Sequence, residues 1–230
     1  MRKRVLETRF RQAMRPVCFL LVLLLVACAQ EPIRVGFAGS ITGRQSALGL
    51  EGKEAVELAI AEANEAGGVG GRRLLLYVRD DADDPARAAA NHLELERLGV
   101  VAVIGHSTSV MMQAAFDALD FYAEARVPVI SGTVSSSLFS GKADSFFRVV
   151  NDSTREAVFG AEFLRGLGVE ALAVAYDAAN ESYALTYAQL MVESFRRLGG
   201  RSAPPVAFNS TAPASDAAVA ESLLEVVGGE

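Results

Sequence analysis

The alternation of short apolar runs with longer amphipathic stretches is the feature of this sequence that most restricts its fold. The apolar runs are Ile33–Ala38, Leu74–Asp80, Val100–Ile104 and Val127–Ile130, and the amphipathic stretches between them are Leu50–Ala66, Pro85–Leu98 and Ser109–Ala125. Strands that alternate with helices at this spacing form right-handed crossovers and a parallel sheet covered on both faces. The pattern therefore predicts an α/β fold.

Local signals support the first two helices. In the first, the apolar side chains fall on one helical face, at Ala55, Val56, Ala59, Ile60 and Ala63. In the second, Asp84 is a good N-cap and Pro85 occupies the first helical position, where its missing N–H costs no hydrogen bond. The glycine-rich run at residues 67–71 predicts the turn that ends the first helix.

The alternation pauses after Ile130 and resumes later in the chain. No helix is predicted between Ile130 and the apolar segment Phe146–Asn151, and the intervening stretch is rich in serine. Further segments then follow at Ser153–Leu167, Ala171–Tyr176, Ser182–Leu198, Val206–Phe208 and Ser215–Val227. We interpret the pause as a crossing between two Rossmann-like lobes, residues 28–150 and a partial second lobe at 151–230. Two such lobes form a cleft at the carboxyl ends of their strands, where ligands bind in open α/β sheets.

The first 27 residues have the pattern of a signal peptide. Basic residues precede the apolar run Val17–Ala27, and this run is shorter than the roughly 20 apolar residues that span a membrane. Met14 would begin a signal of more usual length, so translation from Met1 and from Met14 are two alternatives.

Leu25–Cys28 (LVAC) resembles the bacterial lipobox, in which small residues precede a cysteine whose thiol takes the lipid. A chance cysteine after an ordinary signal is the alternative. We predict lipidation at Cys28, and multiple acylation there would give stable attachment. Cys18 leaves with the signal, so the mature chain has no disulfide framework. The predicted location is the cell envelope, facing the periplasm or the cell exterior, with membrane contact only through the lipid anchor.

The charge of the mature chain excludes some classes of partner. The whole sequence has 22 basic and 28 acidic residues, and residues 1–27 contain six of the basic and one of the acidic residues. The formal net charge therefore changes from −6 to −11 on cleavage. Such a chain is poorly suited to bind nucleic acid or an anionic membrane surface.

Three motifs that suggest other functions are incomplete. Residues 105–109 (GHSTS) resemble a hydrolase nucleophile elbow, but the final glycine is replaced and no histidine follows His106. The acidic run Asp80–Asp84 lacks the ligand spacing of a calcium loop. Gly36, Gly39 and Gly43 do not form a dinucleotide-binding motif.

His92, alone in a helical stretch, is predicted to be partly exposed and not a metal ligand. We expect no catalytic residues, no metal site and no cofactor.

Several blocks of sequence together resemble one known family. These blocks are IRVGFAGSITGRQSALG, EANEAGGVGGRRLLLYVRDDADDPARA, VVAVIGHSTS, VPVISGTVSSS and YDAANESYALTYA. In this order and spacing, over Ile33–Glu230, they are similar to the branched-chain amino acid (Leu/Ile/Val)-binding family of ABC transporters. The resemblance implies a type I periplasmic binding protein fold, whose two α/β lobes close on a ligand.

The resemblance also implies which residues bind the ligand. Ser109 matches a family serine whose hydroxyl holds the ligand carboxylate, and its place before a helix also favours an anion. Thr133, Val134 and Ser135 match the contacts of the loop after the fourth strand. Tyr183 matches a tyrosine that contacts the ligand from the second lobe. Leu48 replaces a frequent aromatic residue, so the side-chain pocket differs here. The alternatives are a helix cap at Ser109, a plain serine-rich loop, and a surface tyrosine.

The end of the sequence departs from the family, which continues through the rest of the second lobe and back into the first. That later segment supplies an acidic residue that pairs with the ligand ammonium, and no residue here is assigned that role. We therefore expect either a fragment or a truncated gene product, with weak ligand binding and reduced stability.

The resemblance implies a function in transport. The expected protein is an extracytoplasmic substrate-binding lipoprotein that delivers an amino acid or similar small polar solute to an inner-membrane ABC permease. The alternative is a ligand-sensing module of a signalling system on the same fold, because one fold serves several functions. The lipobox favours transport, since a sensor usually continues into a membrane helix or an output domain.

The predicted lipidation is directly testable. Mass spectrometry of protein purified from membranes is expected to find acylated Cys28 at the amino terminus, because the apolar run and the small residues before Cys28 form a lipoprotein processing site. A soluble product that begins at Ala29 or Glu31 would contradict this prediction.

Overall fold

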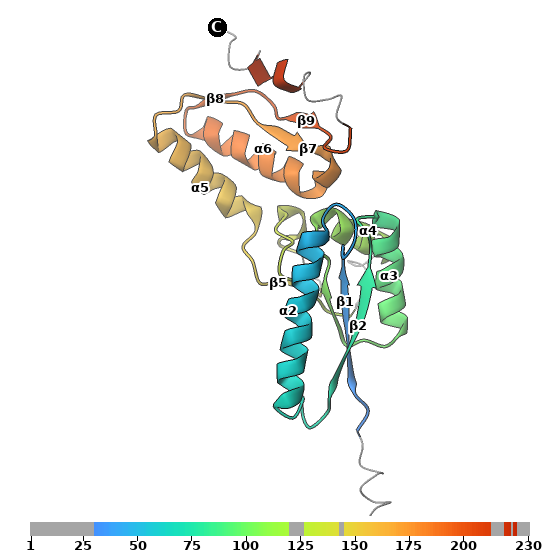
Figure 1. Ribbon diagram of the computed structural model, residues 1–230. Coiled ribbons are helices and arrows are strands. Elements are labelled where there is room, and N and C mark those ends of the chain that lie inside the picture. The colour runs from blue at the N-terminus through green and yellow to red at the C-terminus, as the bar shows by residue number, and fades with distance from the viewer. Residues whose placement is uncertain (1–29, 120–126, 143–144, 213–218, 222, 225–230) are drawn as a thin grey trace, which may run out of the picture.

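The computed structural model describes residues 30–119, 127–142, 145–212, 219–221 and 223–224, and these residues form two α/β lobes (Figure 1). The predicted signal peptide and Cys28 lie outside the described residues. So do the end of the predicted helix Ser109–Ala125 and most of Ser215–Val227. No helix among the described residues is both long enough and apolar enough to span a membrane.

The first lobe is built on a five-stranded sheet in which every neighbouring pair is parallel, in the order β2-β1-β3-β4-β5. The strands are β1 (Ile33–Gly39), β2 (Leu74–Asp80), β3 (Ala102–Gly105), β4 (Val129–Ser131) and β5 (Phe146–Arg148). All five lie within one or two residues of the predicted apolar runs at their starts. The predicted α/β fold with parallel sheets is confirmed for this lobe.

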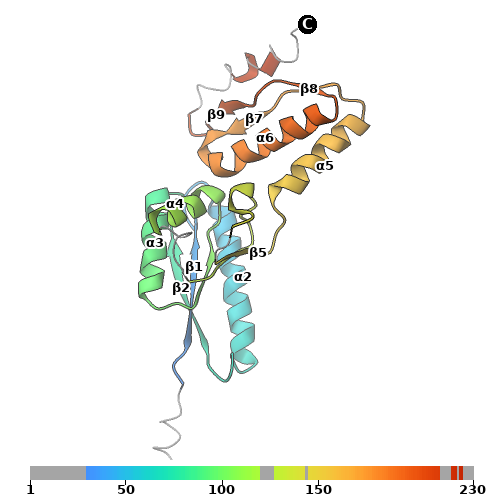
Figure 2. The same cartoon turned by 180° about the vertical axis from the view of Figure 1, so that it is seen from behind.

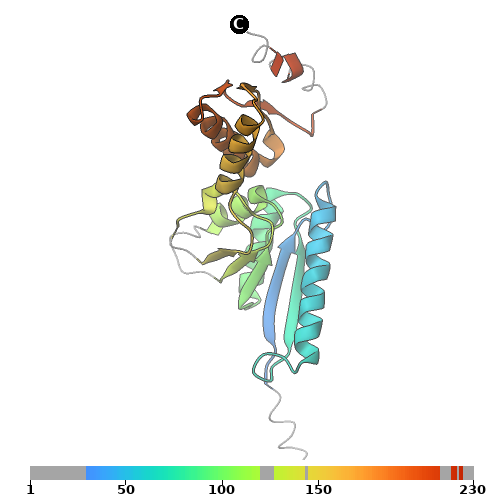
Figure 3. The same cartoon turned by 90° about the vertical axis from the view of Figure 1, so that its left-hand side faces the viewer.

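Helices cover both faces of this sheet (Figure 3). Helix α2 (Ser46–Glu65) packs on β1 and β2, whereas α3 (Pro85–Arg97) and α4 (Ser109–Leu119) pack together on the other face. Asp84 is the N-cap of α3, as predicted, and its carboxylate accepts hydrogen bonds from the N–H groups of Ala86 at 2.8 Å and Arg87 at 3.3 Å.

The core lies between the sheet and the pair α3 and α4. Its fully buried members include Leu95 and Phe116 from the helices and Val103 and Val129 from the strands. The rings of Phe116, Phe139 and Phe146 meet edge to face at centroid distances of 5.6–5.8 Å, an arrangement that aromatic quadrupoles favour.

Helix α2 lies on the opposite face, where it packs on β1 and β2. Its predicted apolar stripe is at most half-buried, and Gly49 is its only fully buried residue among those described. Gly49 is required there, because a Cβ would lie 2.0 Å from the carbonyl oxygen of Ser40. Beyond α2, the paired residues Ile130 and Phe147 leave 37% and 57% of their surface exposed.

The second lobe has shorter strands (Figure 2). They form two parallel pairs, β6 (Ala171–Leu172) with β8 (Arg201–Ser202), and β7 (Ala175–Asp177) with β9 (Val206–Phe208). The predicted single strand Ala171–Tyr176 is therefore divided between β6 and β7. The predicted strand Val206–Phe208 is confirmed.

One helix of the second lobe, α6 (Glu181–Arg197), packs against β7 and β8, and a second helix, α5 (Ser153–Gly166), packs on α6. Both helices lie within one residue of the predicted bounds. Gly160 faces the flexible end of Met191, since a Cβ there would lie 2.6 Å from its terminal methyl. The chain enters this lobe between the end of β5 at Arg148 and the start of α5 at Ser153. The lobe limits of 150 and 151 stay a prediction.

Candidate ligand-binding site

The loops that follow β1, β2, β3 and β4 all lie at the edge of the first sheet that faces the second lobe (Figure 1). Asp80, the last residue of β2, connects two of them. Its carboxylate accepts hydrogen bonds from the N–H groups of Ile41 (2.9 Å), Thr42 (3.1 Å) and Ala82 (2.9 Å), and from the Thr42 hydroxyl (2.5 Å). Burial favours a higher pKa for Asp80, but these hydrogen bonds outweigh it and hold the pKa below the usual value.

A second set of hydrogen bonds joins the loops after β3 and β4. The Ser131 hydroxyl donates to the His106 carbonyl at 3.2 Å and accepts from the N–H groups of Thr133 and Val134. The Thr133 hydroxyl donates to the Ser107 carbonyl at 2.8 Å. These hydrogen bonds within the protein therefore hold the backbone of both loops in place.

Ser109 is the first residue of α4 and is 3% exposed. The preceding residue, Thr108, accepts a 3.4 Å hydrogen bond from the N–H of Met111, so a neighbour rather than Ser109 supplies the side-chain cap. The predicted position of Ser109 at a helix start is confirmed. Its role in binding the carboxylate of a ligand stays a prediction.

The three predicted residues of the β4 loop have different surroundings. Val134 is completely buried in the core, and its N–H is bonded to Ser131. Thr133 is exposed, with its hydroxyl directed to Ser107. The carbonyl of Ser135 accepts a 2.8 Å hydrogen bond from the N–H of Ser153, where α5 begins. Part of the predicted binding capacity of this loop is thus used within the protein.

Tyr183 and Leu48 lie in the first turns of α6 and α2, and both are half-buried. Burial raises the pKa of Tyr183, and the nearby Glu156 carboxylate and Tyr187 add to this effect. The rings of Tyr183 and Tyr187 are 5.8 Å apart. The Tyr183 side chain therefore lies close enough to α5 for the Glu156 carboxylate to affect its pKa.

Direct contacts join the β4 loop to the second lobe. The Ser136 hydroxyl donates to the carbonyl of Ser182 at 2.5 Å and lies 3.3 Å from the Thr186 hydroxyl. Because Ser136 follows Ser135 and Ser182 precedes Tyr183, these contacts bring two predicted parts of the site next to each other. Ser109, on the same edge of the first sheet, belongs to α4, which also packs against α6.

A cavity of about 220 Å³ lies between the lobes. Residues of both lobes line it: Arg44, Gln45, Asp83, Pro85, Thr108, Val110, Met111, Ala179, Asn180 and Thr211. Three of these residues flank or follow Ser109 in the chain. The lining mixes polar side chains such as Arg44 and Asn180 with apolar ones such as Met111, as in sites for small ligands.

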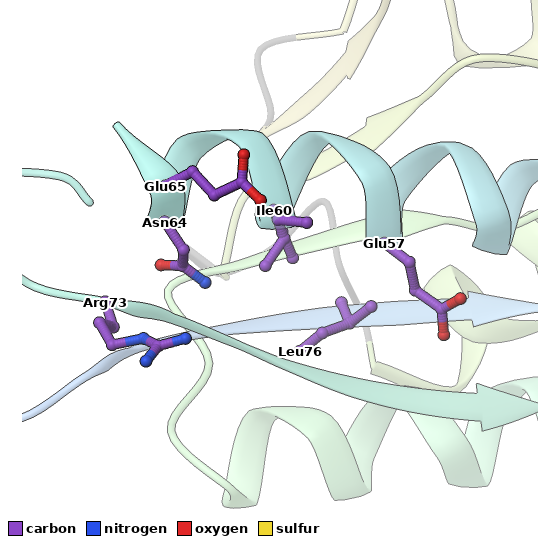
Figure 4. A pocket seen from close by; sticks show the side chains of 7 residues that line it. Glu57, Ile60, Asn64, Glu65, Arg73 and Leu76 are labelled. Carbon is purple, nitrogen blue, oxygen red and sulfur yellow. The ribbon is translucent and has the colours of Figure 1, made fainter. Parts of the chain in front are cut away.

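A larger hollow of about 590 Å³ lies between α2 and β2, at the end of the first lobe away from these loops (Figure 4). Asn64 lines this hollow, but its side-chain amide already accepts from the N–H of Leu74 at 2.7 Å and donates to the carbonyl of Leu74 at 3.0 Å. The amide is therefore not available to a ligand. This hollow is lined by residues of one lobe only. The six predicted site residues are absent from its lining and from the lining of the interlobe cavity.

A buried polar cluster beneath the β3 loop was missed in the sequence. His92, His106 and Asp81 are each 0% exposed. His92 Nδ1 lies 3.1 Å from His106 Nε2, and His106 Nδ1 lies 3.9 Å from Asp81 Oδ2. The prediction that His92 is partly exposed is wrong, because it shares the inner face of α3 with Ala88 and Leu95. Their spacing of three and four residues was the available signal.

In the part of the chain that the structure describes, no group of three or more His, Cys, Asp or Glu side chains is arranged to hold a metal ion.

A family model described as "Periplasmic binding protein" matches residues 32–223, which is most of the chain. The chain belongs to the periplasmic binding protein family. Its similarity to the branched-chain amino acid-binding branch is also confirmed. The Leu/Ile/Val-binding protein homolog 2 of Brucella abortus is 30% identical over 149 residues, 64% of this chain and 39% of that protein. A leucine-, isoleucine-, valine-, threonine- and alanine-binding protein of Pseudomonas aeruginosa is 36% identical over 89 residues, which are 39% of this chain and 24% of that protein.

Solved structures of this family have the same fold. The leucine-binding protein of Thermotoga maritima aligns with a TM-score of 0.70 and 23% identity, covering 83% of this chain and 53% of that one. The Streptococcus pneumoniae branched-chain amino acid-binding protein, solved with isoleucine, aligns with a TM-score of 0.66 and 24% identity. The alignment covers 86% of this chain and 54% of that one. The predicted two-lobed fold is confirmed, and the chain spans about half the length of these proteins.

The hydrogen bonds to Asp80 generate a prediction about pH. Asp80→Asn should lower the free energy of unfolding at pH 7 by about 1–3 kcal/mol, because it weakens several hydrogen bonds to a charged group. The folded pKa of Asp80 is lowered, so its contribution is complete above the unfolded value near ~4 and is lost as pH falls through the folded value. Urea unfolding of both proteins from pH 7 to 3 measures this. An equal difference at every pH, or an effect no larger than that of the surface change Asp117→Asn, would contradict the prediction.

The histidine pair generates a second prediction. His92→Ala should lower the free energy of unfolding by about 2–4 kcal/mol, because it opens a cavity and leaves His106 Nε2 without this partner. His92→Gln, which can still form a hydrogen bond, should cost clearly less. Urea unfolding compares the two variants, and equal losses would show that packing alone holds His92.

Proposed function

We propose that this protein is an extracytoplasmic substrate-binding lipoprotein of an ABC transporter. It binds a small polar solute with a carboxylate, such as an amino acid, between its lobes and delivers it to an inner-membrane permease. The observation that supports this most is the edge of the first sheet. There the start of α4 lines a cavity between the lobes, and the hydroxyl-rich loop after β4 contacts α6 through Ser136.

The ligands of the relatives support the choice of a carboxylate. The Streptococcus structure contains isoleucine. Two Rhodopseudomonas palustris binding proteins of similar fold, with TM-scores of 0.65 and 0.66, contain 3,4-dihydroxybenzoic acid and 4-hydroxybenzoate. These ligands have different side groups but share a carboxylate. A conserved fold that accepts both is expected to place its anion site in the shared scaffold.

The start of α4 is that anion site in our proposal. The first N–H groups of a helix have no acceptor within the helix, and its dipole favours negative charge at this end. Ser109 adds a hydroxyl, and its near-complete burial strengthens hydrogen bonds to a charged group. Thr133 and Ser135 contribute the opposite wall, and the completely buried Val134 supports it from the core.

The second lobe completes the site. Tyr183 buries most of an aromatic ring while its hydroxyl stays able to bond, a combination suited to closing over a small ligand. Leu48, in the first turn of α2, occupies the place where relatives often have an aromatic ring, so a smaller apolar group shapes the side-chain pocket.

The proposed location follows from Cys28 and the mature charge of the chain. A lipid at Cys28 would hold the protein at the membrane while its described residues remain outside it. Its negative net charge makes nucleic acid an unsuitable partner.

The carboxylate site is tested by substitution. Calorimetry or thermal melts with L-leucine, L-isoleucine and 4-hydroxybenzoate first identify a ligand, since a compound that binds only the folded state raises the melting midpoint. Ser109→Ala should then weaken binding by about 1–2 kcal/mol, because a charge-assisted hydrogen bond is lost while backbone donors remain. Ser135→Ala should have a similar effect.

Ser137→Ala, in the short helical turn Ser137–Phe139, is the matched control and should bind normally. Unchanged affinity for both single variants and for their combination would place the carboxylate elsewhere.

A further inference from the structure

Arg44 connects the two lobes. It lies in the loop after β1, and its guanidinium reaches an acidic residue of each lobe. Nε is 3.6 Å from Oδ2 of Asp83, in the loop after β2, and Nη1 is 3.7 Å from Oδ2 of Asp177, at the end of β7. Nη1 also donates a hydrogen bond to the hydroxyl of Ser210, just beyond β9. One side chain thus joins two loops of the first lobe to two segments of the second.

Asp177 is fixed in place for this contact. Its carboxylate accepts hydrogen bonds from the N–H of Ala179 at 2.9 Å, and from the N–H and hydroxyl of Ser210 at 3.1 and 2.6 Å. Burial favours a higher pKa for Asp177, but these bonds and the charge of Arg44 hold the pKa below its usual value. The carboxylate is therefore ionised at neutral pH and oriented toward the first lobe.

The same arginine forms part of the cavity wall. Arg44 and Asp83 line the interlobe cavity from the first lobe, and Ala179, Asn180 and Thr211 line it from the second. The ion pairs therefore join the lobes at the boundary of the space where a ligand would sit. The contacts of Ser136 with α6 form a separate bridge between the lobes.

We propose that Arg44 is a positioning residue that clasps the second lobe over the carboxyl edge of the first sheet. Arginine suits this role because its planar group offers several donors in fixed directions, enough for two carboxylates and a hydroxyl. The effect on ligand affinity rests on the function proposed above: a clasp that raises the population of the ligand-binding arrangement raises the apparent affinity by the same factor.

The strength of the clasp suits a movable contact. The side chains of Arg44 and Asp177 are 39% and 26% exposed, so solvent and salt screen their attraction. A pair of this kind shifts an equilibrium between arrangements by a few-fold rather than fixing it. The lobes can therefore still separate to admit and release a ligand.

The distance between the lobes tests the clasp without any ligand. Spin labels at Glu62 on α2 and Gln189 on α6, both exposed, report this distance in the full chain with Cys18 and Cys28 changed to serine. Arg44→Ala should add a longer component to the distance distribution, and 1 M salt should do the same to the parent. Arg197→Ala, which removes an ion pair within α6, is the matched control and should leave the distribution unchanged.

A charge reversal separates attraction from misfolding. Arg44→Glu and Asp177→Arg should each lengthen the distance, and the two together should restore most of the short component. Unchanged distances in Arg44→Ala and in both reversals, or no restoration in the pair, would overturn the clasp.

A titration with L-leucine tests the link to binding. Arg44→Ala should bind leucine a few-fold more weakly than the parent. Equal affinities would overturn this link. If the distances change as expected but the parent binds no leucine, the clasp is supported and the amino acid ligand of the proposed function fails.

Discussion

Parallel pairing on both sides of β1 is the constraint on which the rest of this structure depends. All seven residues of β1 pair with β2, and Val35–Ala38 also pair with β3. Parallel neighbours require crossovers through helices, and these crossovers bring the ends of the strands to one edge. The loops that gather there would leave many backbone donors unpaired. Asp80 and Ser131 satisfy several of them, so the edge that carries the candidate site is rigid on the first-lobe side.

The two lobes contribute differently to the site. The first has a continuous sheet and a core that includes Phe116 and Val129, so its loops have a firm base. The second has strands of two or three residues and depends on the packing of α5 against α6. Its polar contacts with the first lobe come from Ser136 and Arg44, and α6 also packs against α4. Relative motion is the default expectation for two domains of one chain unless their interface is large and hydrophobic.

Much of the first lobe could be predicted from the sequence, because its strands and helices are encoded locally. Periodicity located the strands, and Asp84 with Pro85 marked the start of α3. The limits of prediction appeared where tertiary contacts decide. The division of Ala171–Tyr176 into two strands depends on which partner each half meets, and the pairing of His92 with His106 depends on the approach of α3 to the loop after β3. For the site, the positions of Ser109 and of the β4 loop were predictable through the family resemblance. The bridge from Arg44 to Asp177 was not, because it joins residues far apart in the chain with no shared motif.

The buried histidine pair also restricts how this chain can change over evolutionary time. His92 and His106 come from different segments and meet through one hydrogen bond in a space closed to water. Losing one imidazole leaves its partner's nitrogen desolvated, whereas replacing both with apolar side chains of similar shape can be nearly neutral. A neutral path between these two states therefore requires paired substitutions. The two positions should covary among close relatives, as two histidines or two apolar residues, with mixed pairs rare.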